Sequence, residues 1–381
     1  MTVERYDAVV FGLGGMGSAA LYHLAKRGAR VCGVERFGVA HDRGSSHGET
    51  RVIRKAYFEH SDYVPLLNRA YTLWEELEAE CGEPLLVKGG AILAGKPNSE
   101  LILGLERCYR EHSLPHERLD AAQAQARYPE FRFPGGTVVF VDPSGGYLFV
   151  ERCIEQHLEM AERHGAVVSI HEDVTAWKAD DSGVTITTDK REIQAGALII
   201  TAGAWTSDAL DDLGVPLRVL RKVQLWYDSP SIGAYSGSGF PVFYVESDGH
   251  GIYGVPAVSE FGMKLAEHTG GATVDDPDTL NRGLEPDDEQ PILRFIHDTF
   301  PNMEPRRTRF SVCMYTVSPD EHFIIDQHPR HANVVIGAGF SGHGFKFASV
   351  VGEILAQLAL DRRTSHPIDF LRLKRFQKDG M

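Results

Sequence analysis

The sequence predicts a mixed α/β fold, in which a parallel sheet of the nucleotide-binding kind carries an inserted antiparallel sheet. Three observations support this prediction. A strand–helix–strand unit with a glycine-rich turn opens the chain, a second buried strand ends in a glycine turn near residue 200, and alternating or aromatic-rich segments lie around it. With 381 residues, the chain is long enough for two domains of ordinary size.

The first unit begins with a short apolar run at residues 6–11 (YDAVVF), which predicts a buried strand. Residues 18–27 (SAALYHLAKR) are rich in helix formers, and residues 29–34 (ARVCGV) predict a second strand. Glycines at this spacing let a pyrophosphate approach the helix N-terminus, and an acid after the second strand can accept hydrogen bonds from ribose hydroxyls. The residues concerned are Gly12, Gly14, Gly17 and Glu35. The motif leaves the choice between FAD and NAD open.

The middle of the chain mixes helices and strands. Helices are predicted at residues 63–81 and 150–164, and a strand pair is predicted within residues 167–186. Residues 137–141 alternate and residues 223–253 are rich in aromatic side chains, so both predict antiparallel sheet. Such a sheet is a plausible floor for a substrate pocket.

A further buried strand, residues 197–205 (ALIITAGAW), bears on the cofactor, because such a strand far from the N-terminus recurs in FAD proteins. A strand at 334–336 and a helix at 345–360 follow near the end. The sequence therefore predicts a Rossmann-type FAD-binding domain with an inserted antiparallel-sheet substrate domain. The predicted FAD-binding domain comprises residues 1–86, 146–216 and 321–381, and the predicted substrate domain comprises residues 87–145 and 217–320.

Two polar clusters could carry chemistry. Residues 44–54 (GSSHGETRVIR) suit a loop around a polar cofactor, and on a helical turn Arg51 and Arg54 would share a face. Two guanidinium groups can bind a carboxylate and favour an anionic reduced flavin, although a solvated basic patch is the simpler interpretation of two arginines alone. In the second cluster, a glycine run precedes a helix that starts near Lys346. A cation is unfavourable at a helix start, and a carboxylate ligand would relieve it.

The chain resembles the family of monomeric sarcosine oxidase and N-methyltryptophan oxidase, among the D-amino-acid-oxidase-like flavoproteins. The resemblance covers essentially the whole chain, and it is carried by long strings: GLGGMGS, GSSHGETRVIR, LIITAGAW, KLAEHTGG, CMYTVSPDEHFIID and GAGFSGHGFKFASVVGEI. It implies that FAD is attached covalently through a thioether to Cys313. It further implies that these residues hold the cofactor: Gly12, Gly14, Gly17, Glu35, Arg36, Ser45, His47, Thr50, Val174, Ala202, Gly203, Gly339, Phe340, Gly342, His343, Gly344 and Lys346.

The resemblance also implies substrate and catalytic roles. Arg54 and Lys346 would hold the substrate carboxylate. The pocket beside the amine would be lined by Tyr253, His268 and Tyr315. The expected catalytic residues are Lys264, Arg51, His268 and Tyr315, with the lysine activating oxygen. From the residues alone, Lys264 and His268 would be a solvated pair four positions apart, so their roles rest on the resemblance.

The implied reaction is oxidation of a secondary amino acid at its CH–NH bond, with oxygen as the acceptor. Sarcosine is the first choice of substrate; N-methyltryptophan, other N-methyl amino acids, pipecolate and fructosyl amino acids are alternatives. A flavin amine dehydrogenase with another acceptor and a non-enzymatic FAD-binding module are rival interpretations. Pocket volume is expected to depend on Trp226, Tyr227, Phe243, Tyr253 and the loop around Tyr57.

The composition of the chain limits which partners, metal sites and locations are expected. A formal net charge of −14 argues against a nucleic-acid partner. The five cysteines are scattered without a CxxC pair, so neither a disulfide framework nor a metal site is expected. No signal peptide and no membrane span are evident, and the expectation is a cytoplasmic, monomeric protein.

Overall fold

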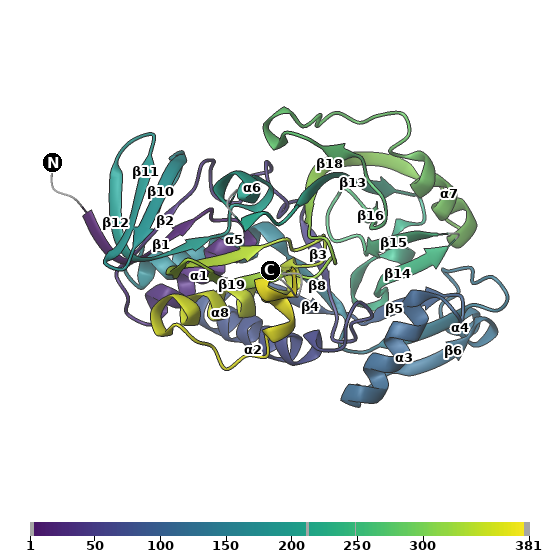
Figure 1. Ribbon diagram of the computed structural model, residues 1–381. Helices are drawn as coiled ribbons and strands as arrows, with labels where there is room; N and C mark the ends of the chain where they lie inside the picture. The colour runs from purple at the N-terminus through teal and green to yellow at the C-terminus, as the bar shows by residue number, and fades with distance from the viewer. Residues whose placement is uncertain (1–3, 211–212, 248, 377–381) are drawn as a thin grey trace.

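The computed structural model describes residues 4–210, 213–247 and 249–376. Two sheets dominate the molecule, which is elongated in the view of Figure 1. The sheet that contains the N-terminal strand lies on the left with helices beneath it, and the second large sheet lies on the right. In this part of the chain, no helix is both long and apolar enough to cross a bilayer.

The eight-stranded sheet has the order β10-β11-β12-β1-β2-β9, and β20 pairs with both β12 and β19. Its centre is parallel, since β1 pairs in parallel with β2 and β12, and β20 pairs in parallel with β12. The strands are β1 (Glu4–Phe11), β2 (Val31–Val34), β9 (Val167–Ser169), β10 (Val174–Asp180), β11 (Gly183–Thr188), β12 (Glu192–Ile200), β19 (Ile324–His328) and β20 (His331–Ala338).

Four helices pack together beneath this sheet (Figure 1). They are α1 (Gly15–Lys26), α2 (Tyr63–Cys81), α5 (Val150–Arg163) and α8 (Ala348–Asp361). Helices α1 and α8 cross very closely, because a Cβ atom on Gly352 would lie 2.5 Å from the backbone of Ala19. A short 3-10 turn, η6 (Phe345–Phe347), precedes α8.

The nine-stranded sheet has the order β17-β13-β16-β15-β14-β5-β7-β6, with β18 paired to β13. One of its faces packs on an aromatic core with α7 (Gln290–Thr299). The strands are β5 (Ala91–Gly95), β6 (Glu117–Asp120), β7 (Val138–Asp142), β13 (Arg218–Asp228), β14 (Val242–Ser247), β15 (His250–Val255), β16 (Met263–Glu267), β17 (Thr273–Val274) and β18 (Arg306–Val317).

A small third sheet joins β8 to β3 and β4. Two helices lie beside β5 and β7, and short helices follow β12. These elements are β3 (Thr50–Ile53), β4 (Leu86–Lys88), β8 (Gly146–Phe149), α3 (Glu100–His112), α4 (Ala121–Arg127), η1 (Gly203–Trp205) and α6 (Thr206–Ala209).

The predicted α/β fold is confirmed, and α2 has the bounds expected from its sequence pattern. The strand pair predicted in the region of residues 167–186 is the antiparallel pair β10–β11, and β9, which precedes it, pairs in parallel with β2. The nine-stranded sheet draws its strands from residues 87–145 and 217–320, and the eight-stranded sheet draws none from them. The two-domain division stays a prediction, and its terminal residues 1–3 and 377–381 lie outside the described part.

Candidate active site

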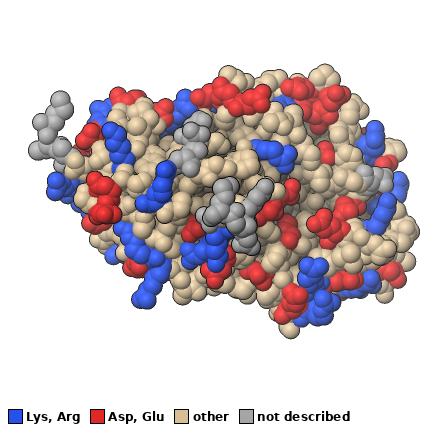
Figure 2. All heavy atoms as spheres, in the orientation of Figure 1, with Lys and Arg blue, Asp and Glu red and all other residues tan. Residues whose placement is uncertain are grey.

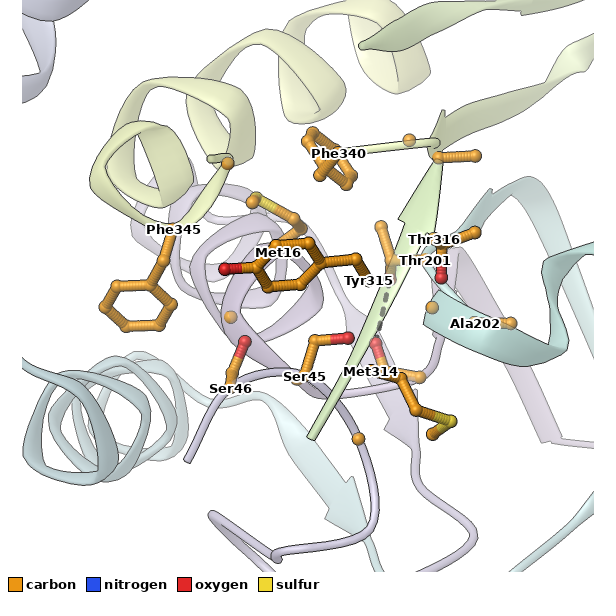
Figure 3. A pocket seen from close by; sticks show the side chains of 18 of the residues that line it. Met16, Ser45, Ser46, Thr201, Ala202, Met314, Tyr315, Thr316, Phe340 and Phe345 are labelled. Carbon is orange, nitrogen blue, oxygen red and sulfur yellow. Dashed lines mark hydrogen bonds between the residues drawn. The ribbon is translucent and has the colours of Figure 1, made fainter. Parts of the chain in front are cut away.

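A cavity of about 680 Å³ is lined by segments from both large sheets. Figure 3 shows side chains converging on it from α1, the 44–54 loop, the segment after β12, β18 and the segment before α8. Tyr315 lies in the middle of this view. The cavity thus joins the glycine-rich turn of the first βαβ unit to the 44–54 loop and to the C-terminal glycine run.

The nucleotide end of the cavity is built from the β1–α1 turn and the end of β2. Gly12 and Gly14 line the cavity, and a Cβ atom on Gly14 would have no neighbour within 4 Å. Glu35 accepts hydrogen bonds from the backbone N–H groups of Leu13 (2.8 Å) and Phe37 (2.9 Å). A carboxylate fixed in this way holds the turn open toward the helix N-terminus, which is where a pyrophosphate binds.

Most of the residues predicted to hold the cofactor line this cavity. They are Gly12, Gly14, Glu35, Arg36, Ser45, Val174, Ala202, Gly203, Gly339, Phe340, Gly342, His343, Gly344 and Lys346. Gly17, His47, Thr50 and Cys313 do not line it. Gly17 instead allows the turn to close, because a Cβ atom there would lie 1.8 Å from the carbonyl oxygen of Gly12.

Unpartnered polar atoms indicate what the cavity accepts. Among the described residues, these buried side-chain atoms have no hydrogen-bond partner: His47 Nε2, Thr50 Oγ1, Tyr109 Oη and Thr316 Oγ1. Thr316 lines the cavity, His47 lies in the segment that precedes β3, and Thr50 is the first residue of β3. Buried polar groups without partners are rare, so a ligand with a polar ring edge fits here. The glycine cradle, the acid and the unpartnered atoms of His47, Thr50 and Thr316 together fit FAD.

The other end of the cavity holds two buried cations. Arg54 is 5% exposed, and its Nη2 donates to both carboxylate oxygens of Glu59 at 3.0 Å. Lys346 is 7% exposed and donates to the carbonyl oxygen of His343 at 2.8 Å. Burial and the neighbouring Arg54 lower the pKa of Lys346 to about 7, against the opposing effect of Glu59. Because Glu59 pairs with Arg54 and can balance only one of the two positive charges, this end of the cavity can accept a second carboxylate from a ligand.

The predicted arrangement of Arg51 and Arg54 on one helical turn is wrong. Arg51 lies in β3, which pairs with β8, and Arg54 follows the end of that strand. Both nevertheless line the cavity, so the alternative of a solvated basic patch is also wrong. Arg51 donates to the carbonyl oxygens of Thr50 (2.9 Å) and Ser45 (2.7 Å) and to Gln224 (3.1 Å).

Aromatic side chains form the wall beside the cations. The rings of Tyr315 and His268 lie 5.6 Å apart, Tyr244 lies 5.9 Å from His268, and Phe58 lies 5.4 Å from Tyr244. Burial, with help from surrounding cations, lowers the pKa of His268 to about 4, so its imidazole is neutral at neutral pH. Tyr253 lines the same cavity and lies opposite Tyr244 in the β14–β15 pair. A ligand amine here would meet rings and a neutral imidazole.

Lys264 is buried and does not line the cavity. Its ammonium group donates to the carbonyl oxygens of Gly48 (2.6 Å) and Thr50 (2.7 Å). Burial and the nearby Arg51 hold the pKa of Lys264 well below its usual range. The sequence-based interpretation of Lys264 and His268 as a solvated pair is therefore wrong.

Strand alternation explains which residues of the nine-stranded sheet approach the site. Cross-strand pairing places Trp226 beside Lys264 and Gln224 beside Ala266 on one face. Leu225, Met263 and Leu265 lie in the aromatic core on the opposite face. Because side chains alternate along a strand, one face of this sheet carries the candidate site and the other carries the core.

Four of the residues expected to set pocket volume are elsewhere. Tyr227 and Phe243 belong to the aromatic core behind the sheet, because their strand positions face away from the cavity. Trp226 and Tyr57 are buried but do not line the cavity. Phe58 and Glu59 do line it and belong to the expected loop around Tyr57, although neither was named individually; Tyr244 lines it and was not named. Phe58 and Glu59 lie four and five positions after Arg54, so their closeness to the arginine-containing string could have pointed to them.

Cys313 lies in β18, one residue before the cavity-lining Met314. Its thiol is buried, at 2% exposure for the residue, and it lies opposite Lys222 in the β13–β18 pair. Lys222 donates to the carbonyl oxygens of His268, Thr269 and Gly270. Among the described residues, no group of His, Cys, Asp and Glu is arranged to hold a metal ion.

Comparisons with known proteins agree with this site. The sequence model of the FAD dependent oxidoreductase family (DAO) matches residues 7–358. Monomeric sarcosine oxidase of Streptomyces avermitilis is 39% identical over 368 residues, covering 95% of this chain and 96% of the relative. N-methyl-L-tryptophan oxidase of Escherichia coli K12 is 37% identical, covering 98% of this chain and all of the relative.

Solved structures share the fold. NikD, an amino acid oxidase of nikkomycin biosynthesis, superposes with a TM-score of 0.85 at 24% identity and covers 97% of this chain and 98% of its own. Glycine oxidase from Geobacillus kaustophilus has a TM-score of 0.81 at 20% identity and covers both chains fully. With the family model matching most of its length and a flavin-sized cavity between its two sheets, this chain belongs to the FAD-dependent oxidoreductases of the DAO family.

Proposed function

We propose that this protein is an FAD-dependent oxidase of secondary amino acids that uses oxygen as the electron acceptor. One observation carries the proposal: two buried cations, Arg54 and Lys346, lie beside a neutral imidazole and a tyrosine in the cavity that fits FAD. That pairing suits an amino acid whose carboxylate is bound while its amine faces the rings. The names of the relatives, sarcosine oxidase and N-methyl-L-tryptophan oxidase, support the same substrate class.

In this proposal, Arg54 and Lys346 bind the substrate carboxylate, with Arg54 exchanging part of its bonding to Glu59 for bonding to the ligand. Tyr315, His268 and Tyr253 then surround the amine and exclude water. The cations disfavour the protonated amine, which must lose its proton before it can donate electrons. Bound FAD supplies the two-electron oxidation, and the protein supplies orientation and electrostatics. The imine product is hydrolysed by water.

Sarcosine is our first choice of substrate. The reaction would be sarcosine + O₂ + H₂O to glycine + formaldehyde + H₂O₂. The alternatives are N-methyltryptophan and other N-methyl, cyclic or fructosyl amino acids. A panel of sarcosine, N-methyltryptophan, pipecolate and fructosylglycine, assayed for peroxide release, tests the choice. Faster peroxide release with sarcosine than with the other three compounds supports sarcosine as the substrate. Faster release with a bulkier amine changes the proposed substrate but keeps the proposed oxidase. If flavin-loaded protein releases no peroxide with any of the four compounds, the proposal is contradicted.

Lys264 and Arg51 distinguish an oxidase from a dehydrogenase in this proposal. A fixed positive charge next to the reduced flavin stabilises superoxide as it forms. The ammonium group of Lys264 shares an acceptor, the carbonyl oxygen of Thr50, with the cavity-lining Arg51. Fast reoxidation by oxygen after anaerobic reduction supports the oxidase; reoxidation that needs another acceptor would favour the dehydrogenase.

We also propose that Cys313 carries FAD through a thioether. Its place in β18 beside Met314, which lines the cavity, supports this. Acid precipitation distinguishes covalent from non-covalent flavin. Flavin that stays with the precipitated protein supports covalent attachment, and flavin released into the supernatant contradicts it. We further propose that His47 and Thr50 contact the flavin ring through their unpartnered atoms. A monomeric, cytoplasmic protein with two domains remains part of the proposal.

A further inference from the structure

Two backbone carbonyl groups hold the ammonium group of Lys264. The turn formed by Gly48, Glu49 and Thr50 supplies them, at 2.6 Å and 2.7 Å from Nζ. Trp226 covers the same ammonium group, with Nζ 5.3 Å from its ring centroid. The position of this charge therefore depends on the conformation of a three-residue turn.

That conformation is an unusual one. Glu49 has φ +65°, in the left-handed region that a side chain other than glycine seldom adopts. Gly48 has φ +90°, and a Cβ atom on it would lie 2.5 Å from Gln224 Oε1. Such a backbone persists only where the surroundings hold it in place.

Two carboxylates hold the turn, one from α5 and one from the turn itself. Glu151, in the first turn of α5, accepts hydrogen bonds through Oε1 from the N–H groups of Gly48 (2.6 Å) and Glu49 (3.2 Å). The side chain of Glu49 accepts a hydrogen bond from the indole N–H of Trp226 at 2.6 Å, and its other oxygen lies 3.5 Å from Arg309. The guanidinium group of Arg309 stacks on the same indole, 4.8 Å from its centroid.

The same carboxylates also oppose the loss of charge at Lys264. Burial and Arg51 favour the neutral amine, whereas Glu151 and Glu49 favour the ammonium form. His47, which lies close enough for Lys264 to lower its pKa, is itself neutral because burial lowers its pKa to about 3. Charge and geometry at this lysine thus depend on the same two acids.

We propose that Glu49 and Glu151 are positioning residues that act through the 48–50 turn to hold Lys264, as a cation, at the edge of the flavin site. The inference rests on the proposed role of Lys264 in the reaction with oxygen. It assigns a task to two acids that touch neither substrate nor cofactor.

The test uses flavin-loaded protein reduced with dithionite, so that no substrate is involved. Reoxidation by oxygen is followed in E151A, E151Q, E49G and K264M, with E155Q, a partly exposed acid on the same helix, as the control. E151Q keeps an oxygen acceptor but removes the charge, and E49G removes the side-chain contacts while relieving the backbone strain. We expect E151A and E49G to slow reoxidation by at least about tenfold, as for loss of a preorganised charge, and E155Q to leave it unchanged.

A second readout does not depend on turnover. Sulfite adds to oxidised flavin and is favoured by nearby positive charge, so its dissociation constant, measured by absorbance, should rise in E151A and E49G as it does in K264M. The thermal unfolding of each variant is recorded. Faster reoxidation in E151Q than in E151A would show how much of the effect of Glu151 comes from its hydrogen-bond acceptor and how much from its negative charge. In the K264M background, E151A should have no further effect, because coupled residues are not additive.

Wild-type reoxidation in E151A, or an E151A effect of equal size with and without Lys264, would overturn the inference. Failure of the proposed function has a different signature. In that case, secondary amino acids do not reduce the wild-type flavin anaerobically, whatever the reoxidation rates of dithionite-reduced protein are.

Discussion

Lys346 is a buried cation whose charge changes near neutral pH. Burial and Arg54 lower its pKa to about 7, and Glu59, which is itself ionised with a pKa lowered to about 2, opposes them. Lys346 is therefore protonated below pH 7 and neutral above it. In contrast, Arg54 stays charged throughout this range, because its pKa is raised further by Glu59 despite burial.

We expect the affinity for a small carboxylate such as acetate to fall as pH rises through about 7, because one of the two cations is lost. Lys346→Met should weaken binding at pH 6 and flatten the profile between pH 6 and 8. Perturbation of the flavin absorbance measures the dissociation constant. Lys374→Met, at an exposed position, is the control. An unchanged pH profile in Lys346→Met would contradict a role for this lysine in carboxylate binding.

At the scale of single residues, the sequence alone could indicate which residue types take part in the candidate site but not how their surroundings bury or pair them. The string containing Arg51 and Arg54 predicted cations correctly, whereas their burial depends on segments far away in the chain. Glu59 escaped notice because a lone acid after a tyrosine and a phenylalanine carries no signal of its own. Its importance arises only when folding brings it to within 3.0 Å of Arg54.

At the scale of elements, the β1–α1 turn requires glycine at two positions for two different reasons. Gly17→Ala would place its Cβ atom 1.8 Å from the carbonyl oxygen of Gly12, so the turn cannot close. In Gly14→Ala, the added Cβ atom would have no protein atom within 4 Å. Because Gly14 lines the cavity, the added methyl group would occupy space where the pyrophosphate is expected to bind.

We expect Gly17→Ala to lower both the melting temperature and the flavin content. Gly14→Ala should keep the wild-type melting temperature of the apoprotein, while FAD binding weakens by about tenfold or more because backbone and phosphate can no longer approach. Circular dichroism and flavin absorbance measure the two effects. Gly135→Ala, where a Cβ atom also has no neighbour, should change neither. Equal loss of stability in Gly14→Ala and Gly17→Ala would contradict this division.

The aromatic wall is also a property of elements, since Phe58 follows β3 and Tyr244 lies in β14. Their contact, with centroids 5.4 Å apart, closes the side of the cavity next to Arg54. We expect Tyr244→Ala to raise kcat/KM for N-methyltryptophan relative to sarcosine by about tenfold, as for the fit of a larger apolar group. Phe243→Ala, behind the sheet, should lower stability without that shift in preference. An equal shift in substrate preference in Tyr244→Ala and Phe243→Ala would contradict the assignment of Tyr244 to the cavity wall.

Strand identity was predictable from alternation and aromatic content, but register was not. Tyr227 and Phe243 were expected at the pocket and lie in the core behind it, because which face of a strand meets the cavity depends on its partners. Long-range pairing is not encoded in local sequence pattern.

At the scale of the whole molecule, the site exists only where the two large sheets meet. The glycine cradle belongs to one sheet, the wall to the other, and the cations to segments beside the small third sheet. On the face shown in Figure 2, lysine and arginine side chains are scattered among acidic ones and form no continuous basic surface in the described part. Cations gather instead inside the molecule, which suits a small anionic ligand better than a polyanion.

The fold class was predictable because strand, helix, strand and acid occur in order at the N-terminus, and because whole strings resemble known flavoproteins. The shape of the cavity was not, since it depends on how residues 44–59, 244–268 and 314–346 pack together. Sequence reasoning therefore identified the cofactor and the class of chemistry more securely than the residues that select the substrate.

The central claim is that secondary amino acids reduce a flavin held in this cavity. Anaerobic mixing of the flavin-loaded protein with sarcosine and with N-methyltryptophan, followed by absorbance, tests it most directly. We predict that at least one of them bleaches the flavin completely, that glycine does not, and that admitting oxygen restores the colour with one H₂O₂ per flavin. Flavin that dithionite bleaches but no secondary amino acid does would contradict the account.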